Sequence, residues 1–256
     1  MTVGNAQTRF SNRVQDYIRY RPGYPQAVMD CLRDEFGLRP PQVVADIGSG
    51  TGISAGLLLE NGHRVIAVEP NADMRAAAET RYGSNGAFQS VAAPAEATTL
   101  PDASIDWIVA AQAFHWFDVE KCRVEFRRIL KRGGFVALLW NDRRDDTPFL
   151  QGYDALLREY AIDYEAIDHR HAESDGRIER LFAPHAPVRR VFPNHQDFDF
   201  DGLRGRVLSS SYMPTAEHPR FNEMIQALRD LYGQHQTGDR VRFDYDTKLF
   251  VGPAGD

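Results

Sequence analysis

The succession of apolar and helical patterns predicts an α/β protein built on a doubly wound, parallel sheet. Five short apolar runs that suit buried strands alternate with helical patterns over residues 26–142. A glycine loop, Gly48 to Gly52, joins the first of these runs directly to a helical pattern. Because crossovers between such units are right-handed, the strands are expected to lie side by side with helices on both faces.

The first half of the chain carries clear strand, helix and cap signals. The runs expected to form strands are residues 43–47, 64–68, 86–92, 104–111 and 135–140. The helical patterns cover residues 26–37, 53–60, 72–79 and 119–131. Gly37 is expected to end the first helix, and Asn71 and Asp118 to cap the third and fourth. Gly133 and Gly134 are expected to break the fourth helix before the fifth strand begins.

The second half of the chain is more charged and less regular. Helices are expected within residues 143–187 and at 203–212 and 220–232, and strands at 188–192 and 241–251. The alternation of the last segment is typical of a half-exposed edge strand. The segments 143–187 and 200–218 are most simply insertions that cover the carboxyl edge of the sheet.

The composition predicts a soluble, cytoplasmic protein. The chain has 256 residues and a formal net charge of −6, and its basic residues are dispersed, so no nucleic-acid partner is expected. Two cysteines, Cys31 and Cys122, without metal-type spacing favour a reducing compartment. The chain starts without a secretory signal and lacks an apolar run long enough for a bilayer, so no membrane partner is expected.

The glycine loop and its neighbours predict a nucleoside cofactor. Glycines allow positive φ and close approach of a ligand, and the following helix start offers free N–H groups. A dinucleotide fingerprint needs its third glycine three positions after the second, where this chain has Ile53. The loop is preceded by Asp46, and the second strand ends in Glu69, whose carboxylate suits a ribose diol.

Several motifs resemble those of class I S-adenosylmethionine-dependent methyltransferases. Asp46–Gly52 is similar to their first motif, Glu69–Pro70 to the acidic tip of their second strand, and Ala95–Glu96 to their adenine contact. Within the methyltransferase type 11 family, two further segments resemble a trans-aconitate methyltransferase-like subgroup: the aromatic run Gln112–Phe117 and the arm with Tyr17 and Arg21–Pro25.

The resemblance implies a fold and a division of the chain. The fold is a Rossmann-like, three-layer α/β/α arrangement with a seven-stranded, mostly parallel sheet. Its antiparallel late strand would include Tyr245–Thr247, and C-terminal insertions would form a cap. The implied regions are an arm and helix covering the cofactor site (1–40), the S-adenosylmethionine-binding core (41–142), and the cap insertions with the last strands (143–256).

The resemblance also implies a cofactor, S-adenosyl-L-methionine, and a set of site residues. The residues expected to bind the cofactor are Tyr17, Arg21, Asp46, Gly48, Ser49, Gly50, Glu69, Pro70, Met74, Ala95, Glu96, Gln112 and Ala113. Arg21 and Tyr17 would reach the methionine carboxylate, unless the arm only lies on the surface. Met74 would contact the adenine or simply fill the core. Walls of the acceptor pocket are expected from His115, Trp116, Trp140 and Tyr212.

The implied reaction is methyl transfer to a small molecule, at a carboxylate or hydroxyl oxygen. A carboxylate needs no base, whereas a hydroxyl would use a catalytic base, for which His115 is the candidate. No Asn/Asp-Pro-Pro-Tyr/Phe signature of DNA or protein N-methyltransferases is present. The oligomeric state stays open.

Three other functions remain open from the sequence. The chain could be a cofactor-binding module without catalysis, since the binding motifs would persist. It could be a NAD-type oxidoreductase, although the glycine spacing is against this. A metal enzyme would draw on the closely spaced His169, His171 and Glu173, although alternate histidines point to different faces.

Overall fold

A seven-stranded sheet in the order β3-β2-β1-β4-β5-β7-β6 forms the centre of the molecule. We describe residues 14–162 and 176–254 of a computed structural model. The strands are β1 (Val43–Ile47), β2 (Arg64–Val68), β3 (Phe88–Val91), β4 (Ile105–Ala111), β5 (Leu130–Arg143), β6 (Val188–Phe198) and β7 (Val241–Pro253). β1 to β5 pair in parallel, and β7 is antiparallel to both β5 and β6. The predicted Rossmann-like, mostly parallel sheet with an antiparallel late strand is confirmed.

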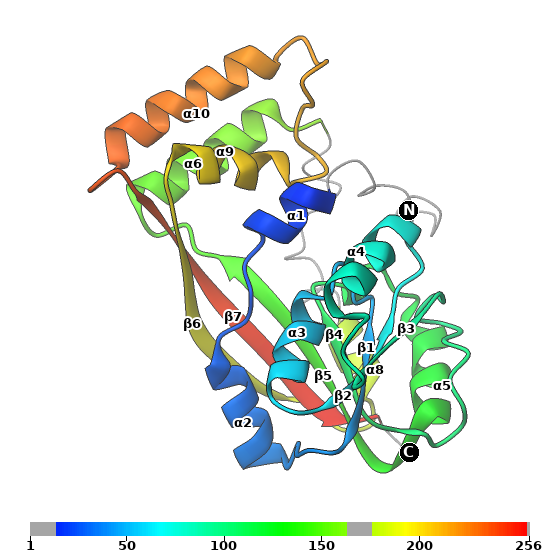
Figure 1. Cartoon of the computed structure of the whole chain (residues 1–256). Helices are drawn as coiled ribbons and strands as arrows, with labels where there is room; N and C mark the ends of the chain where they lie inside the picture. The colour runs from blue at the N-terminus through cyan, green and yellow to red at the C-terminus, as the bar shows by residue number, and fades with distance from the viewer. Residues whose placement is uncertain (1–13, 163–175, 255–256) are drawn as a thin grey trace.

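Helices cover both faces of the sheet and form a separate cap at one end (Figure 1). The α-helices are α1 (Val14–Tyr20), α2 (Gln26–Phe36), α3 (Ile53–Glu60), α4 (Ala72–Tyr82), α5 (Val119–Ile129), α6 (Pro148–Tyr160), α8 (Arg177–Phe182), α9 (Phe200–Leu208) and α10 (Phe221–His235). Along β4, Ile108 packs in the cluster that includes α5 and α8, while its neighbours Trp107 and Val109 pack with α2 and α3. A third apolar cluster joins α6, α9 and α10, the helices of the cap, to Phe243 on β7.

The predicted cap residues act as expected. Gly37 ends α2 in the left-handed region, with φ of 76°. The Asn71 side chain accepts hydrogen bonds from the backbone N–H groups of Asp73 and Met74 at the start of α4. The Asp118 carboxylate accepts one from Lys121 at the start of α5. These local signals therefore fix three helix ends.

Two expectations about strands were wrong. The fifth strand was expected at residues 135–140, but it begins at Leu130, directly after α5, because Leu130 pairs with Ile105 on β4. Gly133 and Gly134 therefore lie within this strand, at a register shift, and not before it. The segment 241–251 is not an edge strand, since β7 lies between β5 and β6, and β6 forms the edge. Alternation of apolar and polar residues indicates that one face of the sheet is more exposed than the other, and an inner strand of such a sheet alternates as an edge strand does.

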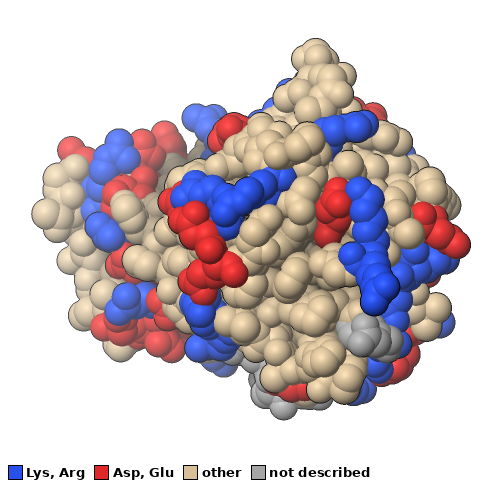
Figure 2. Space-filling model, turned by 90° about the horizontal axis from the view of Figure 1, so that it is seen from below, with Lys and Arg blue, Asp and Glu red and all other residues tan. Residues whose placement is uncertain are grey.

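Charges on the outer surface are mixed. Figure 2 shows one face of the molecule, on which Lys and Arg side chains lie beside Asp and Glu side chains. Ion pairs of the protein surface include Lys131 with Asp106 and Arg190 with Glu35. In the described ranges, none of the helices combines the length and the apolar character that crossing a lipid bilayer demands.

Candidate active site

One cavity of about 300 Å³ lies at the carboxyl edge of the sheet. The residues that line it come from the loops after β1, β2 and β4, from the end of β5, from the arm around α1 and from the cap. Most predicted site residues line it: Tyr17, Arg21, Gly48, Ser49, Gly50, Glu69, Pro70, Met74, Ala95, Glu96, Gln112, Ala113, His115, Trp116 and Tyr212. The sheet's parallel register brings these segments together, although they are distant in the sequence.

The glycine turn after β1 leaves no room for a side chain at Gly48. Gly48 has φ of +69°, and a Cβ there would lie 2.6 Å from the Cβ of Ala113. The backbone N–H groups of Gly48 and Ser49 both donate to the Val68 carbonyl, at 2.8 and 3.2 Å, which ties the turn to the end of β2. The turn therefore presents bare backbone to the cavity, as a closely bound ligand requires.

The Glu69 carboxylate faces this turn. Its Oε2 accepts a hydrogen bond from the Gly50 N–H at 2.9 Å, and its Oε1 accepts one from the Asn71 N–H at 2.8 Å. Glu69 is only 7% exposed, and this burial raises its pKa while the two backbone hydrogen bonds oppose the rise. A carboxylate held beside a glycine turn, with lone pairs to spare, suits the diol of a nucleoside.

Asp46 lies beneath the turn and outside the cavity lining. It is fully buried, and its Oδ2 accepts a hydrogen bond from Ser54 Oγ at 2.7 Å. Burial raises the pKa of Asp46 to about 7, and the nearby Glu69 adds to the rise. Asp46 thus joins β1 to the start of α3, and any effect on a ligand would pass through the turn.

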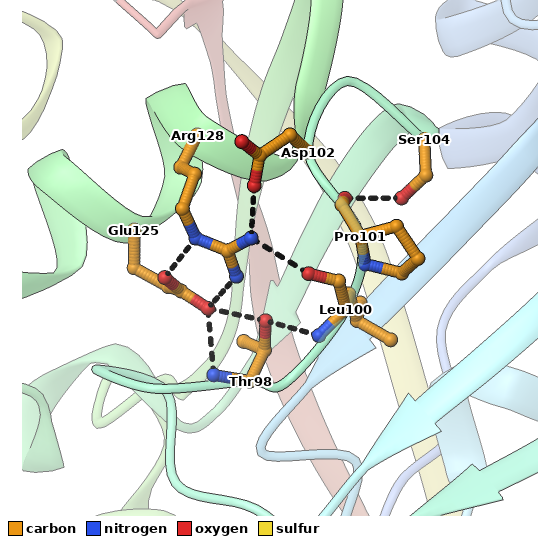
Figure 3. Close-up of polar contacts among 7 residues, drawn as sticks. All are labelled: Thr98, Leu100, Pro101, Asp102, Ser104, Glu125 and Arg128. Carbon is orange, nitrogen blue, oxygen red and sulfur yellow. Dashed lines mark hydrogen bonds and ion pairs between the residues drawn. The ribbon is translucent and has the colours of Figure 1, made fainter.

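A polar network fixes the loop that carries Ala95 and Glu96. Figure 3 shows Glu125 of α5 accepting hydrogen bonds from the backbone N–H and the hydroxyl of Thr98, and the backbone bond measures 2.7 Å. Arg128 donates to the Leu100 carbonyl at 2.8 Å and pairs with Glu125. At the loop's other end, Glu96 Oε1 accepts from the Asp118 N–H at 2.9 Å. The loop is therefore held in place against α5.

The aromatic segment after β4 is strained and tightly packed. Gln112 has φ of 54°, unusual for a residue with a side chain, and its Nε2 donates to the Asn141 carbonyl at 3.1 Å. A short 3₁₀ helix, Phe114–Trp116, follows, in which the rings of His115 and Trp116 are 4.9 Å apart. Both ring nitrogens of His115 are shielded from solvent, and the residue lines the cavity.

Trp140 does not line the cavity, although an acceptor wall was expected there. The indole is 3% exposed and meets the rings of Phe114 and Phe250 edge to face, at 6.1 and 5.8 Å. Successive strand residues point to opposite faces, so Trp140 shares its face with the buried Leu138, and its neighbour Asn141 reaches the cavity instead.

The arm lies against the cap. Arg21 follows α1, with its guanidinium over the Tyr17 ring at 5.0 Å and its Nη2 donating to the Ser209 carbonyl at 3.1 Å. A Cβ on Gly205 of α9 would lie 2.0 Å from the Tyr20 ring, so this glycine allows α1 to approach. Of the two alternatives for the arm, the geometry favours a lid, because Tyr17 and Arg21 line the cavity.

Sequence reasoning missed the cavity residues from late segments. These are Asn141, Asp142, Arg143, Asp145, Asp154, Arg206, Ser211 and Tyr245. Arg143 and Asp154 form an ion pair at 2.7 Å. One signal was available: Arg206 lies between the buried Leu203 and Val207 on α9, and an arginine within an apolar stripe is unusual.

The metal alternative finds no support where the chain is described. His169, His171 and Glu173 lie outside the described residues. Among residues 14–162 and 176–254, no group of three or more His, Cys, Asp or Glu side chains is placed to hold a metal ion.

Comparisons with known proteins agree with this geometry. Residues 45–138 match the type 11 methyltransferase family, described as a methyltransferase domain. A methyltransferase-like protein of Schizosaccharomyces pombe is 26% identical over 94% of this chain and 93% of its own length. A malonyl-[acyl-carrier protein] O-methyltransferase of Marinomonas is 33% identical over 50% of this chain and 48% of its own.

Solved structures share the fold. A candidate type II methyltransferase from Anaeromyxobacter dehalogenans superimposes with a TM-score of 0.67, at 26% identity over 92% of this chain and 98% of its own. A phosphoethanolamine N-methyltransferase of Haemonchus contortus, solved with S-adenosylhomocysteine, has a TM-score of 0.53, at 16% identity over 97% of this chain and 58% of its own. The trans-aconitate methyltransferase-like subgroup stays a prediction. The domain match, the relatives and the shared fold support a class I S-adenosylmethionine-dependent methyltransferase.

Proposed function

We propose that this methyltransferase acts on an oxygen of a small molecule, with a carboxylate as the favoured acceptor. The observation that carries the proposal is that Arg206 and Tyr212 of the cap, with Tyr245 of β7, line the same cavity as the glycine turn. An acceptor beside the cofactor must therefore fit between core and cap, which favours a small molecule. The Marinomonas relative, named as an O-methyltransferase, supports oxygen as the acceptor atom.

The core residues would hold the cofactor. The bare turn at Gly48 and Gly50 would accept the nucleoside, and the Glu69 carboxylate would accept hydrogen bonds from the ribose. Met74 lies next to the turn, since a Cβ on Gly50 would be 3.7 Å from its sulfur, so it can pack against the adenine. Arg21 would bind the methionine carboxylate through its planar fork.

The chain's contribution to chemistry is alignment, with proton transfer only if the acceptor needs it. When bound, S-adenosylmethionine supplies an electrophilic methyl group, which an acceptor oxygen displaces from sulfur. A carboxylate has no proton to lose, so no base is required. A hydroxyl would have to lose one, and His115 on the cavity wall would accept it. Alignment alone can lower such a barrier by about 7–11 kcal/mol.

Calorimetry with S-adenosylhomocysteine tests the cofactor part of this proposal. The wild type is expected to bind, and Glu69→Gln to bind about tenfold more weakly, because a charge-assisted contact to the ribose is lost. Glu60→Gln is the control, since Glu60 is exposed at the end of α3. Equal affinity in all three proteins would mean that Glu69 does not contribute to cofactor binding.

Methyl transfer to a panel of small acids and alcohols tests the acceptor. Labelled methyl from S-adenosylmethionine is expected to appear in a base-labile ester. His115→Ala should then keep ester formation, because a carboxylate needs no base. Label in a base-stable ether, lost in His115→Ala, would instead assign a hydroxyl acceptor.

A further inference from the structure

Two guanidinium groups meet on the cavity wall. Arg21 follows α1 and Arg206 lies on α9 of the cap, and Figure 1 shows α1 next to α9. Arg21 Nη2 and Arg206 Nη1 each donate to the same hydroxyl, Ser210 Oγ, at 3.4 Å. Both residues line the cavity, and Arg206 is only 7% exposed. The fold thus brings a buried and a half-buried cation together on the cavity wall.

Neither arginine has an acidic partner among the described residues. Of the other charged groups on this part of the wall, Arg143 pairs with Asp154 and Asp142 with Lys248, while Asp145 is exposed. The remaining contact of Arg206 is from Nε to the Tyr245 hydroxyl at 3.5 Å. The Nε of Arg21 is buried without a hydrogen-bond partner. Burial and the neighbouring Arg206 both lower the pKa of Arg21.

These two guanidinium groups favour the binding of anions in the cavity. A buried and a half-buried cation that share a neutral hydroxyl lose hydration and repel each other, and a bound anion compensates both effects. The proposed contact of Arg21 with the methionine carboxylate supplies one anion. Arg206 would still lack a counter-ion, and its Nη2 makes no hydrogen bond to any residue in the described ranges.

We propose that Arg206 binds an acid group of the methyl acceptor, a carboxylate or a phosphate, and so restricts acceptors to small anions. The proposal rests on the proposed function, because it assigns Arg21 to the cofactor. A guanidinium offers parallel N–H donors that match either acid group. Tyr212 and Tyr245 line the cavity as well and present neutral hydroxyl groups. An uncharged acceptor would leave the Arg206 charge uncompensated.

The test is calorimetry with malonate and with inorganic phosphate, titrated into protein saturated with S-adenosylhomocysteine at constant ionic strength. The wild type is expected to bind at least one of them, and the stronger of the two identifies the acid group. Arg206→Met should weaken that binding about tenfold or more. Arg204→Gln is the matched control, because Arg204 is exposed on the same helix. Should Arg206→Met not fold, Arg206→Lys keeps the charge without the fork and should still bind the anion more weakly.

Titration of S-adenosylhomocysteine separates the two arginines. Arg206→Met should bind it within about twofold of the wild type, whereas Arg21→Met should bind it about tenfold more weakly. Equal losses in both variants would mean that the cofactor takes both arginines, which overturns the proposal. It is also overturned if neither anion binds the wild type, or if Arg206→Met binds as well as the wild type. Anion binding that needs Arg206, in a wild type that does not bind S-adenosylhomocysteine, would refute the proposed function alone.

Discussion

Gly205→Ala tests whether the arm is docked on the cap. The added Cβ would lie 2.0, 2.3 and 2.4 Å from three atoms of the Tyr20 ring, whereas ordinary contacts begin near 3.4 Å. The ring must therefore retreat by about 1.4 Å, from 2.0 to 3.4 Å, and α1 must move with it. Overpacking of this kind costs about 1–3 kcal/mol, against which alanine in a helix regains up to ~1 kcal/mol.

The displaced helix carries residues of the proposed cofactor site. Tyr17 lies on α1 and Arg21 follows it, so Gly205→Ala should weaken S-adenosylhomocysteine binding as well as lower the unfolding free energy. Urea unfolding and calorimetry measure the two effects. Gly233→Ala is the matched control, because Gly233 lies in α10 with nothing within 4 Å of an added Cβ. It should be stabilising by up to ~1 kcal/mol.

A second substitution shows whether the clash is the cause. Tyr20→Ala removes the ring, so it should cancel much of the loss of stability caused by Gly205→Ala, as a double-mutant cycle measures. Wild-type stability and cofactor affinity in Gly205→Ala would refute the docked arm. Additive losses in the double variant would also refute it, because the two residues would then not be in contact.

Two further predictions concern the glycine turn. Gly48→Ala should abolish calorimetric binding of S-adenosylhomocysteine, because its Cβ would lie 2.6 Å from that of Ala113 at a φ of +69°; undiminished binding would contradict the close approach. Asp46→Asn should change the pH dependence of stability. Burial raises the pKa of Asp46 to about 7 in the folded chain, so the folded state holds the proton more tightly than the unfolded state does. Wild-type stability is therefore partly lost as pH rises from about 4 towards 7, and the variant escapes this loss. Between about pH 5 and pH 8, the free energy of unfolding measured in urea should increase in the variant relative to the wild type, by at most ~3 kcal/mol. Parallel pH profiles of the two proteins would contradict the prediction.

The core could be predicted from the sequence because its signals are local. Asn71 caps α4 with its own side chain, and the turn at Gly48 directly follows β1. The parallel register then brings Glu69 beside the turn, since β1 and β2 pair over their whole length. A strand, a turn and the tip of the next strand are thus enough to place these two parts of the cavity.

The cap could not be predicted in the same way, because its cavity residues depend on distant contacts. Arg206 reaches the wall only because α9 packs in an apolar cluster with α6, α10 and β7. Trp140 was placed on the wrong side because the sequence shows that it is at a strand end but not which face it takes. The position of β7 inside the sheet likewise depends on β6, which pairs with it along its whole length.

Tyr245→Phe tests whether the cap positions Arg206. The Tyr245 hydroxyl accepts from Arg206 Nε at 3.5 Å and donates to Gln196 Oε1 at 3.0 Å, so it links the guanidinium to β6. Loss of such a hydrogen bond costs about 0.5–1.5 kcal/mol, a weakening of malonate or phosphate binding by about two- to tenfold. Cofactor affinity should not change, because the hydroxyl has no hydrogen bond to Arg21. Tyr232→Phe is the control, since its hydroxyl donates to the Asp239 carbonyl at 2.6 Å in the part of the cap outside the cavity lining. An equal loss of anion and cofactor binding in Tyr245→Phe would mean that the two ends of the cavity are not held independently.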